Sequence, residues 1–515
     1  MKLYFLPFLF LAIYSCKEAE PASTPPNIIY ILADDLGIGD IGAFNDSSKI
    51  KTPHLDQLAN EGMKFTDAHT SSSVCTPTRY GIITGRYNWR STLKNGVLTG
   101  ISEALIPDDR TTIADVLGDN GYHTGFIGKW HLGWNWGTIQ DSIIRGEGWD
   151  AKDTDNIDFT KEVTHTPNDL GFDYAYGHSG SLDMAPYVYI ENGKATAIPD
   201  SVTVNTGKYS WWRKGPTSPD FEHEQVTPNF FNRGIKYISE NAKNEKPYFL
   251  YLALPSPHTP ILPTEEWQDK SGLNPYADFM MMIDDYVGKL VAEVNASGEG
   301  DNTIIIFTSD NGFSPAAKKK ELEDKGHFPS YIYRGHKADI FEGGHRVPFI
   351  VKWPKEIKAG RSSDQIICTT DFIATCADIV GTTLNANEGE DSYSFLPILK
   401  SAEGKTARES IIHHSINGSF ALRKEEWKLI LCPGSGGWSN PRPNSKGIDT
   451  LPSYQLYNLA ENPEETKNLI TEYPQIALDL KKELVEIIDN GRSTAGPKQE
   501  NDLGPKAWSQ LEKIR

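Results

Sequence analysis

The stretch NIIYILADD, residues 27–35, indicates the fold of this 515-residue chain. Its apolar run, Asn27–Leu32, is rich in β-branched and aromatic residues and leads directly into two adjacent aspartates, a pattern typical of a strand buried on both faces. Similar runs occur at Thr124–Ile127, Tyr248–Leu254 and Thr303–Thr308, with helical patterns between them. This alternation predicts an α/β domain with a large mixed, mostly parallel sheet sandwiched by helices.

The segments between the strands predict helices and long loops. Helices are expected at Thr111–Asn120, where Gly121 would stop the helix, and at the amphipathic segment Tyr276–Val294. Two long stretches, Asn135–Asp169 and Ala195–Thr227, show no clear period. We expect both to be irregular and to cover a site rather than to form core.

The sequence changes character after about Ser394. Residues Ser419–Leu431 and Tyr454–Leu459 alternate like antiparallel strands, and a helical pattern follows near Pro474–Asp489. The Gly- and Asn-rich stretch Gly381–Gly389 is the linker-like signal before this change. We therefore predict a large α/β domain over residues 27–395 and a smaller C-terminal domain, an antiparallel sheet plus a helix, over residues 396–515.

The N-terminus predicts export. Lys2 precedes the apolar run Leu3–Tyr14, which is too short to span a bilayer and reads as a signal peptide. The run ends at Cys16 in a pattern that resembles the lipobox of bacterial lipoproteins, so residues 1–16 predict a lipid anchor and residues 17–26 a flexible tether. The protein would then be attached to the cell envelope of a Gram-negative bacterium, in the periplasm or on the outer-membrane surface, and would touch the membrane only through its lipid. A plain signal peptide that happens to contain a cysteine is the alternative.

The strongly acidic composition argues against polyanionic binding partners. The formal net charge is −18, so the surface would repel a polyanion, and nucleic acid is not an expected partner. An anionic substrate would need a local basic pocket. The chain has five cysteines. If Cys16 is lipidated and one further cysteine, Cys75, is modified, Cys368, Cys376 and Cys432 would remain. This odd number argues against a disulfide framework, although one pair could still form.

Chemically capable residues follow four of the predicted strands. In a parallel sheet the carboxyl ends of the strands meet at one edge, where ligands bind. The pairs Asp34-Asp35 and Asp310-Asn311, each at the end of a strand, would supply three carboxylates and one amide oxygen, which are ligands suited to Ca²⁺ or Mg²⁺. No sequence cluster of Cys and His predicts zinc. Asp-Asp and Asp-Asn are also common turn formers after strands. The residues concerned are Asp34, Asp35, Asp310, Asn311, Lys129, His131 and His258.

The most specific motif is Cys75-Thr76-Pro77-Thr78-Arg79, followed by Thr84-Gly85-Arg86. Pro77 suits the first turn of a helix that would run through Ile82, which places Cys75 at or near the helix N-terminus. Helix-start amides and Arg79 would favour negative charge there. Taken alone, such a cysteine could equally be structural or an ordinary thiol nucleophile.

Cys-x-Pro-x-Arg followed by Thr-Gly-Arg resembles the maturation signature of type I sulfatases, in which the cysteine is oxidised to formylglycine. The resemblance extends from about Asn27 to Asn468 and keeps the family's order. It implies an alkaline-phosphatase-like fold and a hydrolase that releases inorganic sulfate from sulfate esters. The other motifs that carry it are Ala33-Asp34-Asp35-Leu36-Gly37, Gly128-Lys129-Trp130-His131-Leu132-Gly133, Pro257-His258, Ser309-Asp310-Asn311-Gly312, Arg334-Gly335-His336-Lys337, Glu342-Gly343-Gly344-His345-Arg346-Val347-Pro348 and Leu456-Tyr457-Asn458-Leu459.

The resemblance implies a metal, a modified residue and a maturation partner. The cation, usually Ca²⁺ in this family, would be held by Asp34, Asp35, Asp310 and Asn311, with the oxygen of the modified Cys75 completing the shell. A formylglycine-generating enzyme or an anaerobic sulfatase-maturating enzyme would convert Cys75. The aldehyde hydrate would attack sulfur and then expel sulfate, so that two easier steps replace one hard one.

The same resemblance implies roles for the remaining residues. His131 would be the base for the second step, Lys129 would hold the modified residue, and Arg79 and Lys337 would neutralise the anion together with the metal. We choose His258 as the general acid, because a sugar alkoxide is a poor leaving group that needs a proton. Taken singly, each lysine reads as a surface charge and each histidine as structural.

Substrate contacts are expected from Ser181, Arg346 and the run Trp211-Trp212-Arg213-Lys214. Trp211 and Trp212 could stack on sugar rings while Arg213 pairs with neighbouring sulfates or uronates. They could equally anchor a long loop by hydrophobic burial, and Trp134, Trp136 and Trp438 share this ambiguity. An envelope enzyme with a lid suits sulfated polysaccharide or glycosaminoglycan fragments, but the sequence does not identify the sugar, the sulfate position or exo against endo action.

Two rival functions are consistent with the same fold. A phosphomonoester or phosphonate hydrolase would usually carry Ser or Thr in place of the cysteine and would need further His and Asp ligands for two zinc ions. A glycan-binding lipoprotein without activity would keep the fold and lose the reactive residues. The complete Cys-x-Pro-x-Arg string argues against the first rival, and the full set of polar residues argues against the second.

Overall fold

The computed structural model describes residues 24–140, 144, 147–504, 508 and 510. The expected signal peptide, its Cys16 and the tether up to residue 23 lie outside this part of the chain. In the described part, the helices are all too short or too polar to cross a membrane.

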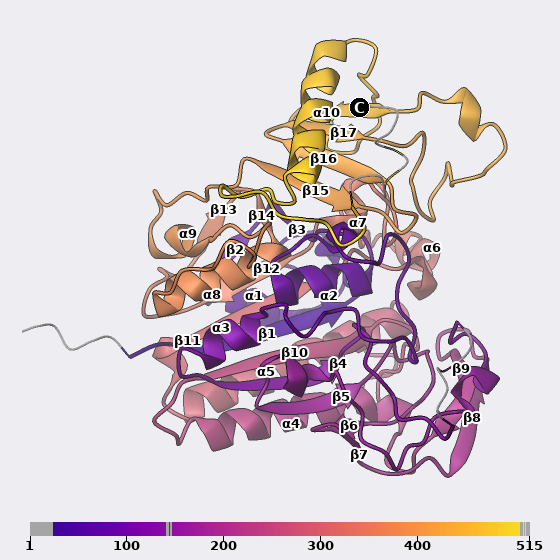
Figure 1. The fold of residues 1–515 in the computed structure, drawn as a ribbon, viewed down its shortest axis with the longest axis vertical. Helices are drawn as coiled ribbons and strands as arrows, with labels where there is room; N and C mark the ends of the chain where they lie inside the picture. The colour runs from indigo at the N-terminus through magenta and orange to yellow at the C-terminus, as the bar shows by residue number, and fades with distance from the viewer. Residues whose placement is uncertain (1–23, 141–143, 145–146, 505–507, 509, 511–515) are drawn as a thin grey trace, which may run out of the picture.

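A ten-stranded mixed sheet forms the centre of the molecule (Figure 1). Its five central strands, in the order β11, β1, β10, β4 and β5, are parallel, and antiparallel pairs extend both sides. The predicted fold class is therefore confirmed. The strands in spatial order are β13 (Arg361–Ser363), β2 (Met63–Phe65), β12 (Phe349–Lys352), β11 (Thr303–Ser309), β1 (Asn27–Asp34), β10 (Tyr248–Pro257), β4 (His123–Lys129), β5 (Tyr174–His178), β6 (Ile190–Glu191) and β7 (Lys194–Ala195).

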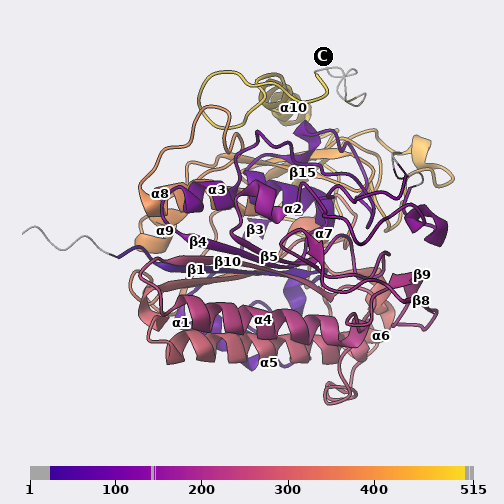
Figure 2. The same cartoon turned by 60° about the horizontal axis from the view of Figure 1, so that its bottom comes forward.

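Helices cover both faces of this sheet (Figure 2). Strand β1 explains why two layers are needed, because alternate residues enter different cores: Tyr30 packs on one side and Ile31 on the other. One layer contains α2 (Cys75–Thr84), α3 (Ile113–Gly118), α8 (Phe372–Val380) and α9 (Leu396–Lys400), and the other contains α1 (Pro53–Glu61), α4 (Val226–Asn241) and α5 (Pro275–Ala296). The short helices α6 (Lys319–Glu323) and α7 (Glu342–His345) belong to the loops beyond β11.

The predicted elements differ from the observed ones mainly at their ends. Helix α3 is shorter than predicted and ends at Gly118, although Gly121 does adopt a positive φ of 88°. Helix α5 extends the predicted Tyr276–Val294 segment by one residue at its start and two at its end. The prediction that Ala195–Thr227 is irregular is wrong in part, because β8 (Ser201–Asn205) and β9 (Trp212–Thr217) pair there as an antiparallel hairpin.

The C-terminal part forms a separate antiparallel sheet with one long helix. It contains β15 (Ser410–His414), β16 (Phe420–Lys424), β17 (Trp427–Ile430), β18 (Gln455–Asn458) and α10 (Pro474–Asp489). Helix α9, just after the expected boundary at residue 395, still packs in the core of the large sheet. The remaining two-stranded sheet pairs β3 (Ala68–His69) with β14 (Ile367–Cys368).

Candidate active site

The carboxyl ends of the central strands bring the predicted residues to one edge of the large sheet. The register pairs Ala33 of β1 with Ser309 of β11, so Asp34 and Asp310 follow side by side. On the other side, Asp34 lies opposite Pro257, the residue before His258. Strand register alone therefore joins residues that are more than 200 positions apart in the sequence.

Three buried oxygens at this edge have no hydrogen-bond partner: Asp34 Oδ1, Asp35 Oδ2 and Asn311 Oδ1. Unpaired buried acceptors are costly, and an all-oxygen set suits a hard divalent cation. The residues present therefore fit such an ion. Asp310 differs from the others, because its Oδ1 accepts from the Asp35 backbone N–H at 3.3 Å and its Oδ2 accepts from Arg79 Nε at 2.9 Å.

Three buried cations surround these acids. Arg79 lies 2.9 Å from Asp310 and 3.4 Å from Asp34, and also donates to the carbonyls of Lys129 and Leu254. Lys129 Nζ contacts Asp34 Oδ2 and donates to Ser181 Oγ at 2.8 Å. Lys337 Nζ lies 2.6 Å from Asp35 Oδ1. These three cations offset the charge of the three buried carboxylates, so a bound divalent cation would give the site the local positive charge that an anionic substrate requires.

The acids respond differently to this environment. Burial acts to raise the pKa of both Asp34 and Asp310. At Asp34, Lys129 and other cations outweigh burial and hold the pKa well below its usual range. At Asp310, burial and the neighbouring negative charge of Asp34 outweigh Arg79 and raise the pKa to about 7. A divalent cation would favour the ionised form of both.

Cys75 begins helix α2 as predicted, and Gly85, with a φ of 64°, ends the helix. The thiol is buried, and this burial raises its pKa. Backbone hydrogen bonds hold the loop before the helix. Ser73 N–H donates to the His414 carbonyl at 3.0 Å, and the Ser73 carbonyl accepts from Ala338 N–H at 2.7 Å. The loop that carries Cys75 is thus tied to the segment that carries Lys337.

His131 is fully buried behind the acids. Its Nε2 is 2.8 Å from the Leu98 carbonyl, which can only accept, so Nε2 carries the hydrogen and Nδ1 is the free lone pair. Nδ1 has no hydrogen-bond partner. Burial, and then the positive charge of Lys129, hold the pKa of His131 well below its usual range. The unpartnered Nδ1 is a lone pair that could accept a proton.

His258 and Ser181 form a second pair at this edge. The Nδ1 of His258 hydrogen-bonds to the Thr259 carbonyl, so Nε2 is the nitrogen left for chemistry. Nε2 lies 3.4 Å from Ser181 Oγ and 3.7 Å from Asp35 Oδ2. Ser181 thus lies between Lys129 and His258. Lys129 contacts Asp34 and His258 lies near Asp35, so both residues lie next to the candidate cation site formed by Asp34, Asp35, Asp310 and Asn311.

A cavity of about 540 Å³ opens onto this group. Cys75, Ser181, His258 and Lys337 line it, and much of the remaining wall is aromatic or aliphatic. Trp149 from the first predicted lid segment and Trp211 and Arg213 from the second also line it, as does Trp438. Both long segments therefore cover the site as predicted. Trp134 and Trp136, in contrast, are buried in the core.

Two predicted substrate contacts are not at the cavity. Trp212 is the first residue of β9 and directly follows Trp211, but successive side chains of a strand point to opposite faces. Trp212 instead stacks on His223 at 3.9 Å. Arg346 is buried among Glu342, Asp67 and the Thr66 carbonyl, at 2.9, 2.7 and 2.7 Å. Both are structural residues, so these two expectations are corrected. The sequence also gave no reason to select Trp149 or Asp183, which do line the cavity.

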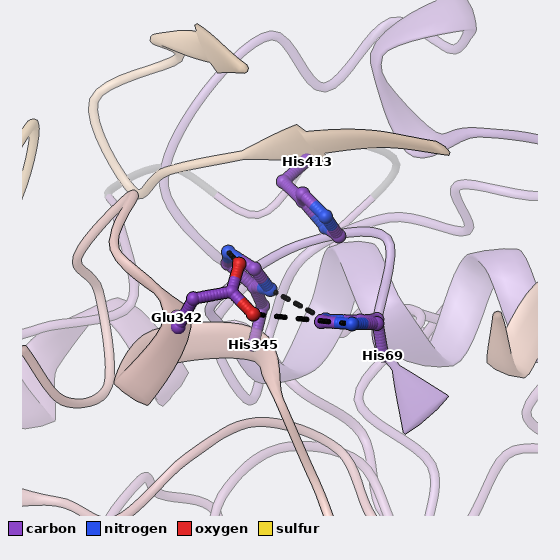
Figure 3. A group of neighbouring side chains, drawn as sticks. All are labelled: His69, Glu342, His345 and His413. Atoms are coloured by element: carbon purple, nitrogen blue, oxygen red, sulfur yellow. Dashed lines mark hydrogen bonds and ion pairs between the residues drawn. The ribbon is translucent and has the colours of Figure 1, made fainter. Parts of the chain in front are cut away.

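A second buried cluster consists of His69, Glu342, His345 and His413 (Figure 3). The rings of His345 and His413 stack at 3.6 Å with an angle of 11° between them. Parallel rings at this distance cannot both direct an in-plane nitrogen at one ion with Zn–N bonds of about 2.0–2.1 Å. Glu342 is already paired with Arg346 and with Lys428, the latter at 3.0 Å. We assign this cluster a structural role.

The remaining cysteines carry no cross-link. Cys75, Cys368, Cys376 and Cys432 are all free and buried, so the described part of the chain contains no disulfide. This agrees with the argument from the odd number of cysteines.

The mostly parallel sheet with helices on both faces, and the cluster of carboxylate and amide oxygens at its carboxyl edge, place the chain in the alkaline-phosphatase-like superfamily. The chain belongs to the sulfatase family, whose model, Sulfatase, matches residues 26–382. A second model, N-sulphoglucosamine sulphohydrolase, C-terminal, matches residues 336–436. The protein is therefore a sulfuric ester hydrolase.

Similar proteins support this assignment across almost the whole chain. An N-acetylgalactosamine-6-O-sulfatase of Bacteroides thetaiotaomicron is 32% identical over 512 residues, covering 92% of this chain and 94% of its own. Human arylsulfatase A is 29% identical, covering 87% and 83%. A solved B. thetaiotaomicron 6S-sulfatase, described with the metabolism of multiple glycosaminoglycans, has a TM-score of 0.77 at 30% identity and covers 90% of this chain and 99% of its own.

Proposed function

We propose that this sulfatase uses a formylglycine at position 75 and one Ca²⁺ ion to remove sulfate esters from sulfated polysaccharide or glycosaminoglycan fragments. The observation that carries the proposal is that Cys75 shares a cavity with Lys337 and His258, which lie 2.6 Å and 3.7 Å from Asp35, one of the residues with an unpaired buried oxygen. Mg²⁺ fits the same oxygen ligands less specifically. A formylglycine-generating or anaerobic sulfatase-maturating enzyme would be the partner that modifies Cys75.

The residues of the chain have separable tasks in this proposal. Asp34, Asp35, Asp310 and Asn311 would hold the cation, which would polarise a sulfate oxygen. The modified residue 75 would supply the oxygen nucleophile. Lys129 and Lys337 would balance negative charge as it moves onto the oxygens, and Arg79 orients Asp34 and Asp310.

Two histidines would move protons. His131 presents an unpartnered Nδ1 and suits the role of base during release of sulfate from residue 75. His258 lines the cavity, and its Nδ1–H is held by the Thr259 carbonyl. When the ring is doubly protonated, its Nε2 would donate that second proton to the departing sugar oxygen and become a lone pair. The Ser181 hydroxyl would fix the relative positions of the His258 ring and the Lys129 ammonium group by hydrogen bonding to both.

Relatives indicate which sugar to test first. The B. thetaiotaomicron relative acts on N-acetylgalactosamine 6-sulfate according to its name, and so do rat and human relatives at 26% and 27% identity. We propose a 6-sulfated N-acetylgalactosamine unit as the first candidate.

The direct test is sulfate release from a panel of sulfated oligosaccharides and 4-nitrophenyl sulfate, using protein made together with a maturating enzyme. We expect turnover of the aryl sulfate and of at least one sulfated sugar. Tight binding without turnover would favour the glycan-binding lipoprotein, and preferred turnover of phosphate esters would favour the phosphatase.

Removing the imidazole of His258 should separate sugar substrates from activated ones. A sugar alkoxide needs protonation as the S–O bond breaks, whereas 4-nitrophenolate does not. We expect His258→Ala to lower kcat by roughly 10²- to 10⁴-fold on a sugar sulfate and far less on 4-nitrophenyl sulfate. Equal losses on both, with metal content and residue 75 intact, would reassign His258 to sulfate binding and leave Lys337 as the candidate acid.

We also propose that the protein is exported and held in the cell envelope by a lipid on Cys16, as the N-terminal sequence suggests. Mass spectrometry of the N-terminal peptide from the membrane fraction tests this. An acylated Cys16 would support the anchor, and a soluble protein cleaved elsewhere would support a plain signal peptide.

A further inference from the structure

In the part of the chain that the structure describes, each long cationic side chain of the cavity wall has a carboxylate partner. Among the lining residues that the structure describes, the two long cationic side chains are Lys337 and Arg213. Lys337 is paired with Asp35 at 2.6 Å. Arg213 NH1 contacts Asp183 Oδ2 and also lies 3.3 Å from the Asp183 carbonyl. The guanidinium on which the expected contact with a neighbouring sulfate depends therefore already has a carboxylate partner.

Asp183 commits its charge to Arg213. The carboxylate is 9% exposed, and its other oxygen, Oδ1, is buried without a hydrogen-bond partner. Arg213 is therefore the main charged contact of Asp183. Since both charges are largely removed from water, their attraction is stronger than that of an exposed pair, and the pair contributes no net charge to the wall.

The pair holds an aromatic surface in place. The Arg213 guanidinium lies 4.7 Å from the ring centres of both Trp149 and Trp211. These rings remain 43% and 37% exposed, and Trp438, on another part of the cavity wall, is 38% exposed. Exposed aromatic faces in a cavity offer contact to the C–H faces of a ring, but nothing that stabilises a second anion.

We infer that this cavity selects a sugar unit with one sulfate and an otherwise uncharged ring, and that the Asp183–Arg213 pair determines this selection. The inference rests on the proposed function. A second sulfate or a carboxylate on the same ring would lose its hydration on binding. It would then contact tryptophan faces and an arginine already paired with Asp183, so its desolvation would not be offset by a new ion pair. Asp183 is thus a specificity-determining residue that acts by cancelling Arg213.

The substrate test compares two probes that differ in one group, N-acetylgalactosamine 6-sulfate and the corresponding 4,6-disulfate. We expect wild-type protein to favour the singly sulfated sugar by roughly tenfold or more in kcat/KM. If the panel identifies a different sugar, its singly and doubly sulfated forms replace this pair. Equal or faster turnover of the disulfated sugar overturns the inference. Failure to cleave any sulfate ester, with residue 75 modified, would instead overturn the proposed function.

Two variants test the role of the pair through the ratio of these two rates. Asp183→Asn leaves Arg213 uncancelled, so we expect the preference for the singly sulfated sugar to fall by roughly tenfold. Arg213→Gln removes the cation and should retain the preference. Asp220→Asn, which changes an exposed aspartate bonded to Thr196, is the matched control and should leave the ratio unchanged. A merely structural role would slow both sugars alike in Asp183→Asn, and an unchanged ratio there would contradict the assignment.

Discussion

Replacing Cys75 by alanine should reduce sulfate release by roughly 10⁵-fold or more on every substrate, because the variant lacks the group from which the nucleophile is made. Cys75 begins α2 and lines the cavity beside Lys337 and His258. Peptide mass spectrometry of active wild-type protein should show an aldehyde at position 75, and the rate assay should track the modified fraction.

The matched control is Cys376→Ala. Cys376 is also free and fully buried, but it lies within α8 and does not line the cavity. We expect this variant to keep its turnover number while losing some stability to the small cavity that it creates. Fully active protein that shows only unmodified Cys75 would contradict the mechanism, and full activity of Cys75→Ala would show that the site is misplaced.

Asp35→Asn should remove the cation and with it almost all turnover. The substitution keeps the size of the side chain but removes a charge from the oxygen set, and Lys337 loses its carboxylate partner at 2.6 Å. We expect one Ca²⁺ per wild-type chain by elemental analysis, little or none in the variant, and a rate reduced by roughly 10³-fold or more. Chelation should also lower the melting temperature of wild-type protein, because a bound ion stabilises the folded state.

Asp284→Asn serves as the matched control for this variant. Asp284 is a buried aspartate of α5 that accepts hydrogen bonds from the backbone N–H groups of His54 and Leu55, and it does not line the cavity. The Asp284→Asn variant should bind one Ca²⁺ per chain and release sulfate at the wild-type rate. Two zinc ions per chain, or activity indifferent both to exhaustive chelation and to Asp310→Ala, would move the protein to the phosphatase class.

The sequence predicts the large sheet and its chemical edge well because both depend on local patterns. A fully buried strand such as β1 shows as a continuous apolar run, and a residue directly after it must lie at the carboxyl edge. That is why Asp34, Asp310 and His258 meet as predicted. Helix α2 was equally readable, since Pro77 marks a first turn.

The rest depends on packing that sequence spacing does not encode. The run Trp211-Trp212-Arg213 carried no sign that it was a strand, so the opposite orientation of Trp212 could not be anticipated. Arg346 lies in a family motif, yet its buried partners are Asp67 and Glu342. The histidine cluster adds His69 and His413 to Glu342 and His345, and only the last two share a sequence motif, so spacing alone does not reveal the cluster.

The joint between the two sheets limits how such proteins can recombine. Arg423 and Lys428 of the C-terminal sheet form ion pairs with Asp67 and Glu342 of the large domain. The His414 carbonyl accepts a hydrogen bond from the backbone N–H of Ser73, in the loop before Cys75. A gene fusion that replaced the C-terminal sheet by that of a distant relative would leave buried charges without partners. Each broken pair would lower the free energy of unfolding by about 3–5 kcal/mol. The two halves are therefore expected to be inherited together, and new specificities to arise by change in the loops around the cavity.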